Sequence, residues 1–502
     1  MAVSGTNSRR PPALLDVPLL DRPPGTAAPG NQAARVHAAL REAILGGRLM
    51  AGARLPASRT LSQQLGVSRN AVVAAFEALQ GDGLVQARVG AGTYVATRLP
   101  ARAVAVPALR KAASKAPAAP PRPPQQPFAL GVPAVDKLLL QRLAGALRRQ
   151  VTRAEVDALG YGDPRGSEAL RQQLAAHLAA SRGIVCEADS LLITSGVQQA
   201  LRLCAQALLQ PGDGVWVEDP GYPVARRTLA AAGLKLRPVP VDAEGIDVAA
   251  GLRRHRAARA AYVTPSHQFP MGVTMSMARR LALLEWAREH QAWVLEDDYD
   301  SEFRYAGPPL TALAGIDGPE RVIYIGTFSK TLFPSLRLAY LVLPAAARER
   351  VIAARANFDR FGPRLLEDAV ATLLADGNFA AHLRRARKQC LAARDRLAAT
   401  LQHAAGNALR VERPTQGLHL LATLPAGLPA DAGARIREAA GVHAVLLSET
   451  RLVPRSGEAF VLGFSGHALP AVEAAAQALG RAARQYLAQQ PRRSGRRAMP
   501  VR

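Results

Sequence analysis

From residue 160 onward, short apolar runs alternate with stretches of helical periodicity, and this alternation limits the possible folds more than any other feature. In order, the runs are SLLITSG, VWVEDP, AAYVTPS, AWVLEDDYD, RVIYIGTFSK and LAYLVLP. Strands that alternate with helices predict an α/β fold with a mostly parallel sheet. Ligands of such sheets bind in the loops at the carboxyl ends of the strands, so a functional site is expected there.

The chain has 502 residues, which is too long for a single core of ordinary size, so several domains are expected. Residues 99–127 are rich in proline and alanine and read as a linker. We therefore expect a disordered tail over 1–30, a first domain over 31–98, a second domain over 128–490 and a basic tail over 491–502. Within the second domain, a smaller α+β subdomain is expected from about residue 393.

Composition excludes several classes of protein. The three cysteines, Cys186, Cys204 and Cys390, are far apart and lack metal-ligand spacing, so neither a disulfide framework nor a metal site is expected. No apolar stretch approaches the roughly 18 residues of a membrane span, and the N-terminus has no apolar signal region. A soluble cytoplasmic protein is therefore expected. The net charge of +25 favours a polyanion such as nucleic acid as partner, although an arginine-rich proteome would also raise it.

The first domain has the pattern of three helices followed by two short strands. The helices are expected over 33–45, 58–65 and 69–80, with Ser58 and Ser68 as N-caps of the second and third. A short turn with glycine separates these two helices, which is the spacing of a helix-turn-helix. The third helix is expected to bury Val72, Val73, Phe76 and Leu79. Strands over 84–88 and 93–96 would flank VGAG as a hairpin wing.

This arrangement predicts how the first domain contacts double-stranded DNA. Arg69 and Asn70 open the third helix after Ser68, where such side chains meet base edges in the major groove. Arg59 and Arg88 are better placed for phosphates. Each arginine alone is more simply a solvated surface charge, but the set on one motif favours DNA. The stretch RLPASRTLSQQLGVSRNAVVAAFEALQGDGLVQARVGAGTYVA resembles the winged helix of GntR-type bacterial repressors, with Ala71 where that family often has threonine.

In the second domain, chemically distinctive residues fall at the ends of the predicted strands. Asp297 ends an apolar strand beside three further acids, and a cationic partner would relieve their repulsion. At TSG, the amides of Val197 and Gln198 after Gly196 open a helix and can hold a phosphate. Near Lys330 lie the hydroxyls of Thr327 and Ser329 and the guanidinium of Arg337. Taken singly, the acidic run reads as a metal cluster or a solvated turn. The TSG stretch reads as an ordinary helix start, and Lys330 as a structural lysine.

Together they predict a site for pyridoxal 5′-phosphate. Lysine forms an imine with an aldehyde, a carboxylate keeps the ring nitrogen protonated, and amides, hydroxyls and arginine hold the phosphate. Lys330 is accordingly the predicted catalytic lysine, with Asp297 as partner of the ring nitrogen.

The set also resembles the fold type I aminotransferases, from about residue 128 to 487. This resemblance implies that Tyr299 lies near the ring 3-oxygen and that Tyr222 stacks on the ring. Tyr161 would reach the phosphate of the neighbouring subunit in a head-to-tail homodimer. Either His267 or Gln268 would lend a polar group to the ring.

Joined head to tail, the two resemblances imply a MocR-type regulator. Two functions remain: a transcription factor that uses the second domain as an effector sensor, or an aminotransferase that carries a DNA-binding module. Aminotransferases bind the substrate carboxylate with an arginine near the C-terminal strand, but EAFVLGFSGHALP has none, and Arg226 could replace it only if turned inward. We therefore expect a regulator that senses pyridoxal phosphate or an amino compound, with vitamin B6 supply genes as targets suggested by the family.

Overall fold

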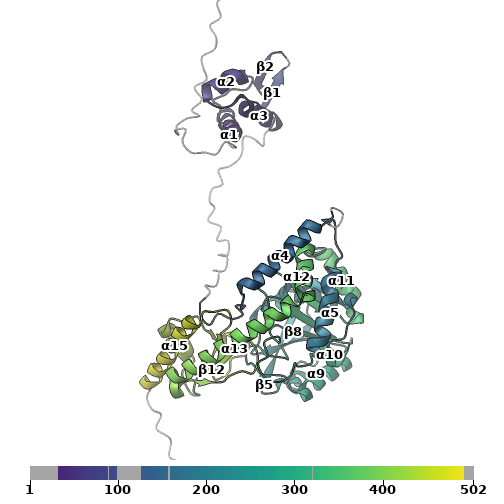
Figure 1. The fold of residues 1–502 in the computed structure, drawn as a ribbon, viewed down its shortest axis with the longest axis vertical. Helices are drawn as coiled ribbons and strands as arrows, with labels where there is room; N and C mark the ends of the chain where they lie inside the picture. Colours follow the sequence, from purple (N-terminus) through teal and green to yellow (C-terminus); the bar gives the residue numbers. More distant parts are fainter. Residues whose placement is uncertain (1–31, 89, 99–125, 156–158, 319, 491–502) are drawn as a thin grey trace, which may run out of the picture. The chain divides into compact units, whose positions relative to one another are not determined.

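The computed structural model describes residues 32–88, 90–98, 126–155, 159–318 and 320–490 (Figure 1). The chain divides into two compact units, residues 1–121 and 122–502, here called the head and the body. The expected tails over 1–30 and 491–502, and nearly all of the expected linker, lie outside the described residues. Among the described residues, no helix is both long and apolar enough to cross a membrane.

The head is a three-helix domain with a two-stranded wing, as the sequence predicts. Its helices are α1 (Gln32–Leu45), α2 (Ser58–Leu65) and α3 (Arg69–Gly81), and the antiparallel hairpin joins β1 (Val85–Arg88) to β2 (Gly92–Val95). Gly66 ends α2 in the left-handed region at φ 61°, which turns the chain tightly into α3. The Ser68 hydroxyl accepts a hydrogen bond from the Ala71 amide at 3.2 Å, so the predicted cap of α3 is present.

Two local predictions for the head are wrong. Ala57, not Ser58, is the N-cap of α2, and no side chain caps this helix because the serine is already its first helical residue. Val73 is 36% exposed, whereas Ala71 and Ala75 are buried with Val72 and Leu79. The face that packs against α1 is thus centred one position away from the one expected. Val73 turns outward because Ala71 and Ala75 occupy the buried face, and Phe76 packs partly buried against the same core.

The body is built on an eight-stranded sheet in the order β3-β10-β9-β8-β7-β4-β5-β6. Its strands are β3 (Leu191–Thr194), β4 (Gly214–Asp219), β5 (Lys235–Asp242), β6 (Gly245–Ile246), β7 (Ala258–Val263), β8 (Trp293–Asp298), β9 (Val322–Thr327) and β10 (Ala339–Val342). The five strands β5, β4, β7, β8 and β9 run parallel to one another. The predicted α/β class and mostly parallel sheet are therefore confirmed.

One strand inside the sheet runs against both of its neighbours. β10 is antiparallel to both β9 and β3. Only a loop with the short 3₁₀ helix η4 (Pro334–Leu336) separates it from β9, and so short a connection without a crossover helix returns the chain antiparallel. This returning loop carries Lys330 and Arg337.

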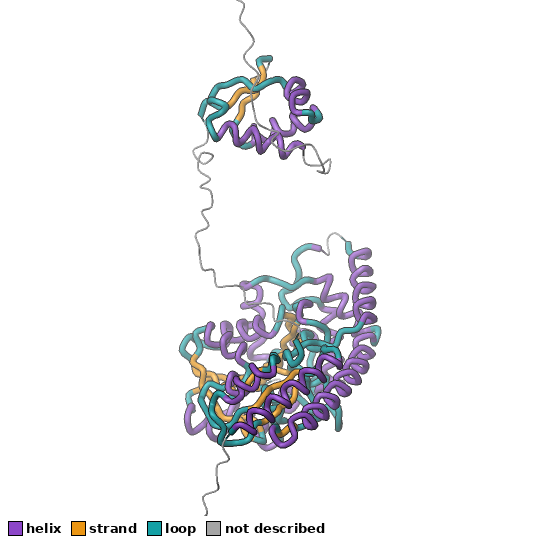
Figure 2. The backbone as a smooth tube through the Cα atoms, turned by 90° about the vertical axis from the view of Figure 1, so that its left-hand side faces the viewer, coloured by secondary structure: helices purple, strands orange, loops and turns teal. Residues whose placement is uncertain are grey.

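Helices cover both faces of this sheet, and Figure 2 shows them around the orange strands. One face packs on α4 (Lys137–Arg153), α5 (Glu168–Arg182), α8 (Val248–His255), α9 (Met277–Glu289), α10 (Leu313–Asp317) and α12 (Arg364–Ala375), and the other on α6 (Val197–Leu208), α7 (Pro223–Ala231) and α11 (Ala345–Phe358). Strand residues alternate between the two cores: Trp216 faces the first, while Val215 and Val217 face the second. Burial on both faces explains why the strands are continuous apolar runs.

A second, smaller sheet completes the body. Its antiparallel order is β11-β12-β14-β13, with β11 (Arg410–Val411), β12 (His419–Thr423), β13 (Val445–Leu446) and β14 (Ala459–Gly463). Around it lie α13 (Asn378–Ala405), α14 (Ala432–Ala440), α15 (Leu469–Gln489) and the 3₁₀ turns η5 (Gly406–Ala408) and η6 (Leu447–Thr450), while η3 (Ala188–Ser190) precedes β3. The long helix α13 contributes Phe379 to the core of the large sheet and Leu397 to that of the small one. Phe128 also packs in the small core and bridges to Gly463, which places the segment that starts at Phe128 beside the small sheet.

Candidate functional site

A cavity of about 420 Å³ lies at the carboxyl ends of β8 and β9. Ten of the twelve predicted cofactor residues line it: Gly196, Val197, Gln198, Tyr222, Asp297, Tyr299, Thr327, Ser329, Lys330 and Arg337. The loops of parallel strands bring these residues together from distant parts of the chain. Tyr161 and His267 are not among the lining residues.

Lys330 follows β9 in the loop that returns to β10. Its Nζ lies 3.4 Å from the Gly131 carbonyl oxygen, to which it donates. Gly131 has φ 71°, and a Cβ there would overlap Nζ, so only glycine leaves room for the amine. Burial lowers the pKa of Lys330, an effect that the carboxylates of Asp300 and Asp297 oppose. A lowered pKa increases the share of neutral, nucleophilic amine.

Asp297 is a buried carboxyl group, and only one of its two oxygens has a hydrogen-bond partner among the described residues. Oδ2 accepts from the Tyr262 hydroxyl at 2.5 Å, whereas Oδ1 is buried and has no hydrogen-bond partner among the described residues. Burial raises the pKa of Asp297 to about 7, with Asp298 adding to the rise and Tyr262 and Lys330 opposing it. A cationic N–H donor in the cavity would pair Oδ1 and favour the carboxylate.

The three neighbouring acids each have a separate structural partner. Glu296 accepts from the Leu313 and Ala314 amides at the start of α10, at 2.8 and 2.9 Å. Asp298 pairs with Arg182 at 2.8 Å and accepts from the Tyr324 hydroxyl. Asp300 pairs with His267 at 3.0 Å. The acidic run is therefore not a solvated turn, and Asp297 is the member that faces the cavity.

A second part of the cavity wall suits an anion. Gly196, at φ 144°, precedes α6, so the free amides of the first turn of α6 open onto the cavity. Arg337 is an exposed residue in the left-handed region at φ 56°. Its guanidinium has no hydrogen-bonding or acidic partner among the described residues and would lie 3.4 Å from a Cβ on Gly196. Helix amides and an unpaired guanidinium at one place are the ligands that a phosphate uses.

Aromatic and polar residues form the remaining walls. Tyr222 precedes α7 and packs edge-on against Phe269 at 5.5 Å between ring centroids. The Tyr299 hydroxyl lies 3.1 Å from Nδ1 of His267. His267 thus stands behind Tyr299 and Asp300, and Gln268 donates to Glu218 and to backbone carbonyls. Neither candidate of that loop reaches the cavity wall.

The structure adds cavity residues that are not predicted from the sequence. They are Leu130, Gly131, Leu201, Val224, Ala225, Tyr262, Thr264, Phe269, Pro334, Leu418 and His419. The sequence does contain a signal that would place Tyr262 at the cavity, because this residue lies near the end of β7, the strand next to β8. The sequence gives no such signal for Gly131 and His419, because the small sheet and the segment beside it place these residues at the cavity.

His267, Asp300 and His419 form a buried polar cluster with ligand atoms within 4.8 Å of one another. Asp300 is already paired with His267, and Nε2 of His419 bonds the Pro270 carbonyl at 3.0 Å. Hydrogen bonds thus occupy Nδ1 of His267 and Nε2 of His419, whereas Nε2 of His267 is buried without a partner among the described residues.

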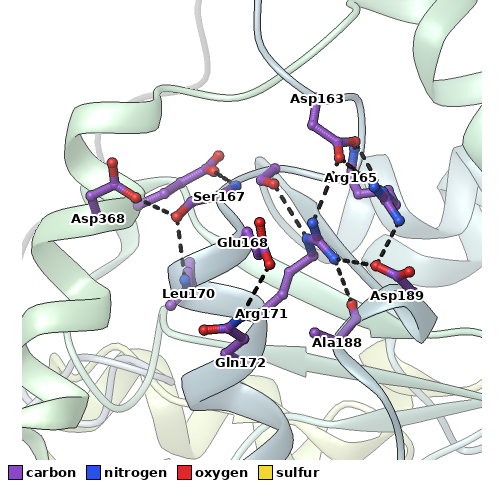
Figure 3. A network of polar contacts seen from close by, with 12 residues as sticks. Asp163, Arg165, Ser167, Glu168, Leu170, Arg171, Gln172, Ala188, Asp189 and Asp368 are labelled. Atoms are coloured by element: carbon purple, nitrogen blue, oxygen red, sulfur yellow. Dashed lines mark hydrogen bonds and ion pairs between the residues drawn. The ribbon is translucent and has the colours of Figure 1, made fainter. Parts of the chain in front are cut away.

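Tyr161 lies away from the cavity and is 82% exposed. The Arg360 guanidinium stacks on its ring at 4.4 Å. The following loop is held by an ionic network in which Arg165 pairs with Asp163 and Asp189, and Arg171 joins the same two acids (Figure 3). Tyr161 is thus an exposed aromatic residue that precedes a loop held by ion pairs.

In the head, the predicted DNA-contacting side chains lie on the surface. Arg59, Arg69, Asn70 and Arg88 are exposed, and none of the three arginines has an acidic partner among the described residues. Arg88 stacks over the Tyr94 ring at 4.7 Å in the wing. Arg69 and Asn70 open α3 directly after its cap, so they project from the end of the helix that such motifs insert into DNA.

Comparison with known proteins agrees with this division. Residues 32–95 match the family "Bacterial regulatory proteins, gntR family", and residues 125–467 match "Aminotransferase class I and II". The probable rhizopine catabolism regulatory protein MocR of Rhizobium meliloti is 34% identical over 86% of this chain and 90% of its own length. The pyridoxine biosynthesis transcriptional regulator PdxR of Corynebacterium glutamicum is 32% identical over 70% of this chain and 74% of its own.

Among solved structures, the α-aminoadipate aminotransferase LysN of Thermus thermophilus, complexed with N-(5'-phosphopyridoxyl)-L-leucine, resembles the body. It has a TM-score of 0.64 and 29% identity, over 72% of this chain and 92% of its own.

Proposed function

The chain belongs to the MocR-type members of the GntR family, and on that premise we propose that it is a transcriptional regulator whose body senses pyridoxal 5′-phosphate. The head supplies sequence-specific binding to double-stranded DNA. The body supplies a ligand site whose occupancy alters that binding. A cytoplasmic location follows from such a role.

In the head, base recognition is assigned to the start of α3. Arg69 can make a bidentate contact with guanine, and Asn70 with adenine. The hydroxyl of Ser68 fixes the helix start that carries both residues. Arg59 and Arg88 bind backbone phosphates. These contacts set the position of the domain on the duplex but do not distinguish one base sequence from another.

In the body, the cavity residues fit pyridoxal phosphate. The unpaired Oδ1 of Asp297 would accept from the ring nitrogen, and the α6 amides, Thr327, Ser329 and Arg337 would hold the phosphate. Tyr222 would stack on the ring, and Tyr299 would bond its 3-oxygen. When bound, the cofactor supplies a reactive aldehyde and an electron-accepting ring, and Lys330 is the amine within reach.

The set of cations in the cavity favours a sensor over an aminotransferase, and this observation carries the proposal. Lys330 and Arg337 are the only Lys or Arg residues among its described lining residues. Arg226, the one candidate for a substitute, is buried in α7 and donates to the Thr450 carbonyl at 2.8 Å. A substrate carboxylate would therefore lack the bidentate partner that makes its binding strong.

Ligand occupancy can reach DNA through the dimer. We propose a head-to-tail homodimer in which the exposed Tyr161 of each body completes the phosphate site of the other. A ligand that binds two arrangements of this dimer unequally shifts their populations. The linker would then convert each arrangement into a different spacing of DNA half-sites. Genes of vitamin B6 supply are the proposed targets, supported by the likeness to PdxR.

The experiment has two stages. Sequencing the genomic DNA that the purified protein retains identifies its operator. Footprinting on that operator then compares cofactor-free protein, protein with pyridoxal phosphate, and protein with the cofactor plus a panel of amino acids. The proposal expects the cofactor alone to change the footprint or affinity. Identical footprints with and without cofactor, or rapid keto-acid production from the panel, contradict it.

A further inference from the structure

His419 is a cavity residue that the proposed cofactor contacts do not use. It opens β12 of the small sheet, pairs in register with Gly463, and is 4% exposed. Its ring lies 5.7 Å from that of Phe269 and 4.9 Å from that of His267. The small sheet thus contributes a titratable ring to a cavity otherwise built mainly by the large sheet.

The hydrogen bonding of His419 determines which of its nitrogens carries the proton. Nε2 lies 3.0 Å from the Pro270 carbonyl oxygen, and because a carbonyl can only accept, Nε2 must be the protonated nitrogen. Burial lowers the pKa of His419 to about 4, with nearby His267 and Lys330 acting in the same direction and Asp300 opposing. The ring is therefore neutral near pH 7, and Nδ1 carries a lone pair.

Nδ1 has no hydrogen-bond partner among the described residues, which leaves it available to a cavity ligand. A neutral ring nitrogen of this kind accepts from an O–H or N–H group. It repels a carboxylate, which offers only lone pairs. The charged groups lining the cavity are Lys330, Asp297 and Arg337, all three already assigned to the cofactor.

We propose that His419 selects the effector that shares this cavity with the cofactor: a small primary amine that carries a hydroxyl or second amine donor, rather than an amino acid. The inference rests on the proposed function, because the cavity must hold pyridoxal phosphate for such an amine to meet it. It adds the chemical class of the effector and names the residue that recognises it.

Three amines of equal carbon count test the proposal. Protein loaded with pyridoxal phosphate is titrated with 3-amino-1-propanol, n-propylamine and β-alanine, and apparent dissociation constants are measured from the cofactor absorbance and by calorimetry. One added hydrogen bond predicts that aminopropanol binds about 5–10-fold more tightly than propylamine. β-Alanine should bind more weakly than propylamine. Tightest binding by β-alanine, or equal binding of all three, overturns the proposal.

Two variants tie the preference to the ring nitrogen. His419→Leu should bind aminopropanol and propylamine equally, whereas His419→Asn, whose amide oxygen can replace Nδ1, should keep a preference for aminopropanol. An unchanged preference in His419→Leu contradicts the assignment. If this variant does not load cofactor, the His419→Asn result and the native ligand series decide.

Failure of the inference can be distinguished from failure of the proposed function. If the native protein takes up pyridoxal phosphate and its DNA binding responds, but the amines are not discriminated, only the effector class is wrong. If the native protein does not take up the cofactor, the proposed function is wrong as well.

Discussion

The head and the body perform their proposed functions with side chains in opposite environments. Arg69 and Arg88 are exposed, and water solvates their charges before DNA binds. Asp297 and Lys330 are held where burial opposes the charge of each. Changes in the head should therefore alter DNA affinity and leave the fold intact, whereas changes in the body should alter ionisation and ligand binding together.

The sharpest test of the body is the loss of its amine. Lys330→Ala should abolish borohydride-dependent attachment of pyridoxal phosphate, because no other lysine lines the cavity. Peptide mass mapping after reduction measures the attachment. Lys235→Ala, at an exposed position on β5, is the matched control and should label like the native protein. A label on any lysine other than Lys330 would show that the cavity is not the attachment site.

Asp297 should make the cofactor-free body less stable as pH rises. Between about pH 5 and 7, its carboxyl stays protonated in the folded protein, because its pKa is about 7, but is ionised in the unfolded chain. The folded state then binds more protons, so the free energy of unfolding falls with pH by about 1.4 kcal/mol per unit from this group. Thermal or urea unfolding of Asp297→Asn should show a flatter pH dependence than the native protein.

The control for this variant is Asp376→Asn, which alters a half-exposed carboxylate paired with Arg149. It should retain the native pH dependence. If the free energy of unfolding has the same slope against pH in the native protein and in Asp297→Asn, burial does not raise the pKa of Asp297.

Arg69→Ala tests base recognition in the head. We expect it to weaken operator binding by about 1–3 kcal/mol and to reduce the preference for operator over random DNA. Unfolding should be unchanged, since the guanidinium is exposed and makes no ion pair among the described residues. Fluorescence anisotropy on both DNAs measures the two affinities. Equal losses on both would place Arg69 on phosphates instead.

Arg88→Ala is expected to have the smallest effect. A lost phosphate contact weakens operator and random DNA alike and reduces the slope of log affinity against log salt by about 1. Anisotropy at several salt concentrations gives that slope. Arg48→Ala, which alters a guanidinium that pairs with Glu42, is the control and should keep the native slope. A loss confined to the operator would make Arg88 a base-reading residue.

The same contrast explains what could be predicted from the sequence. In the head, Ser68, Arg69 and Asn70 are consecutive, so a helix start predicts their placement, and only the cap of α2 and the packing of Val73 differ from the prediction. In the body, the positions of Asp297, Lys330 and the α6 amides could be predicted, because each lies at or just after the end of a predicted strand. These predictions follow from the strand pattern. The antiparallel β10, Gly131 and His419 do not, because their positions depend on a short return loop and on the small sheet that packs beside it.

The central claim is that the cofactor site and DNA binding are coupled, and linkage gives its most direct test. The affinity for pyridoxal phosphate is measured with and without saturating operator, and the affinity for operator with and without saturating cofactor. Coupling requires the two ratios to be equal, and typical allosteric coupling of 1–3 kcal/mol predicts a factor of about 5–150. Ratios of one in both titrations would contradict the claim and leave the cofactor as a structural component of the body.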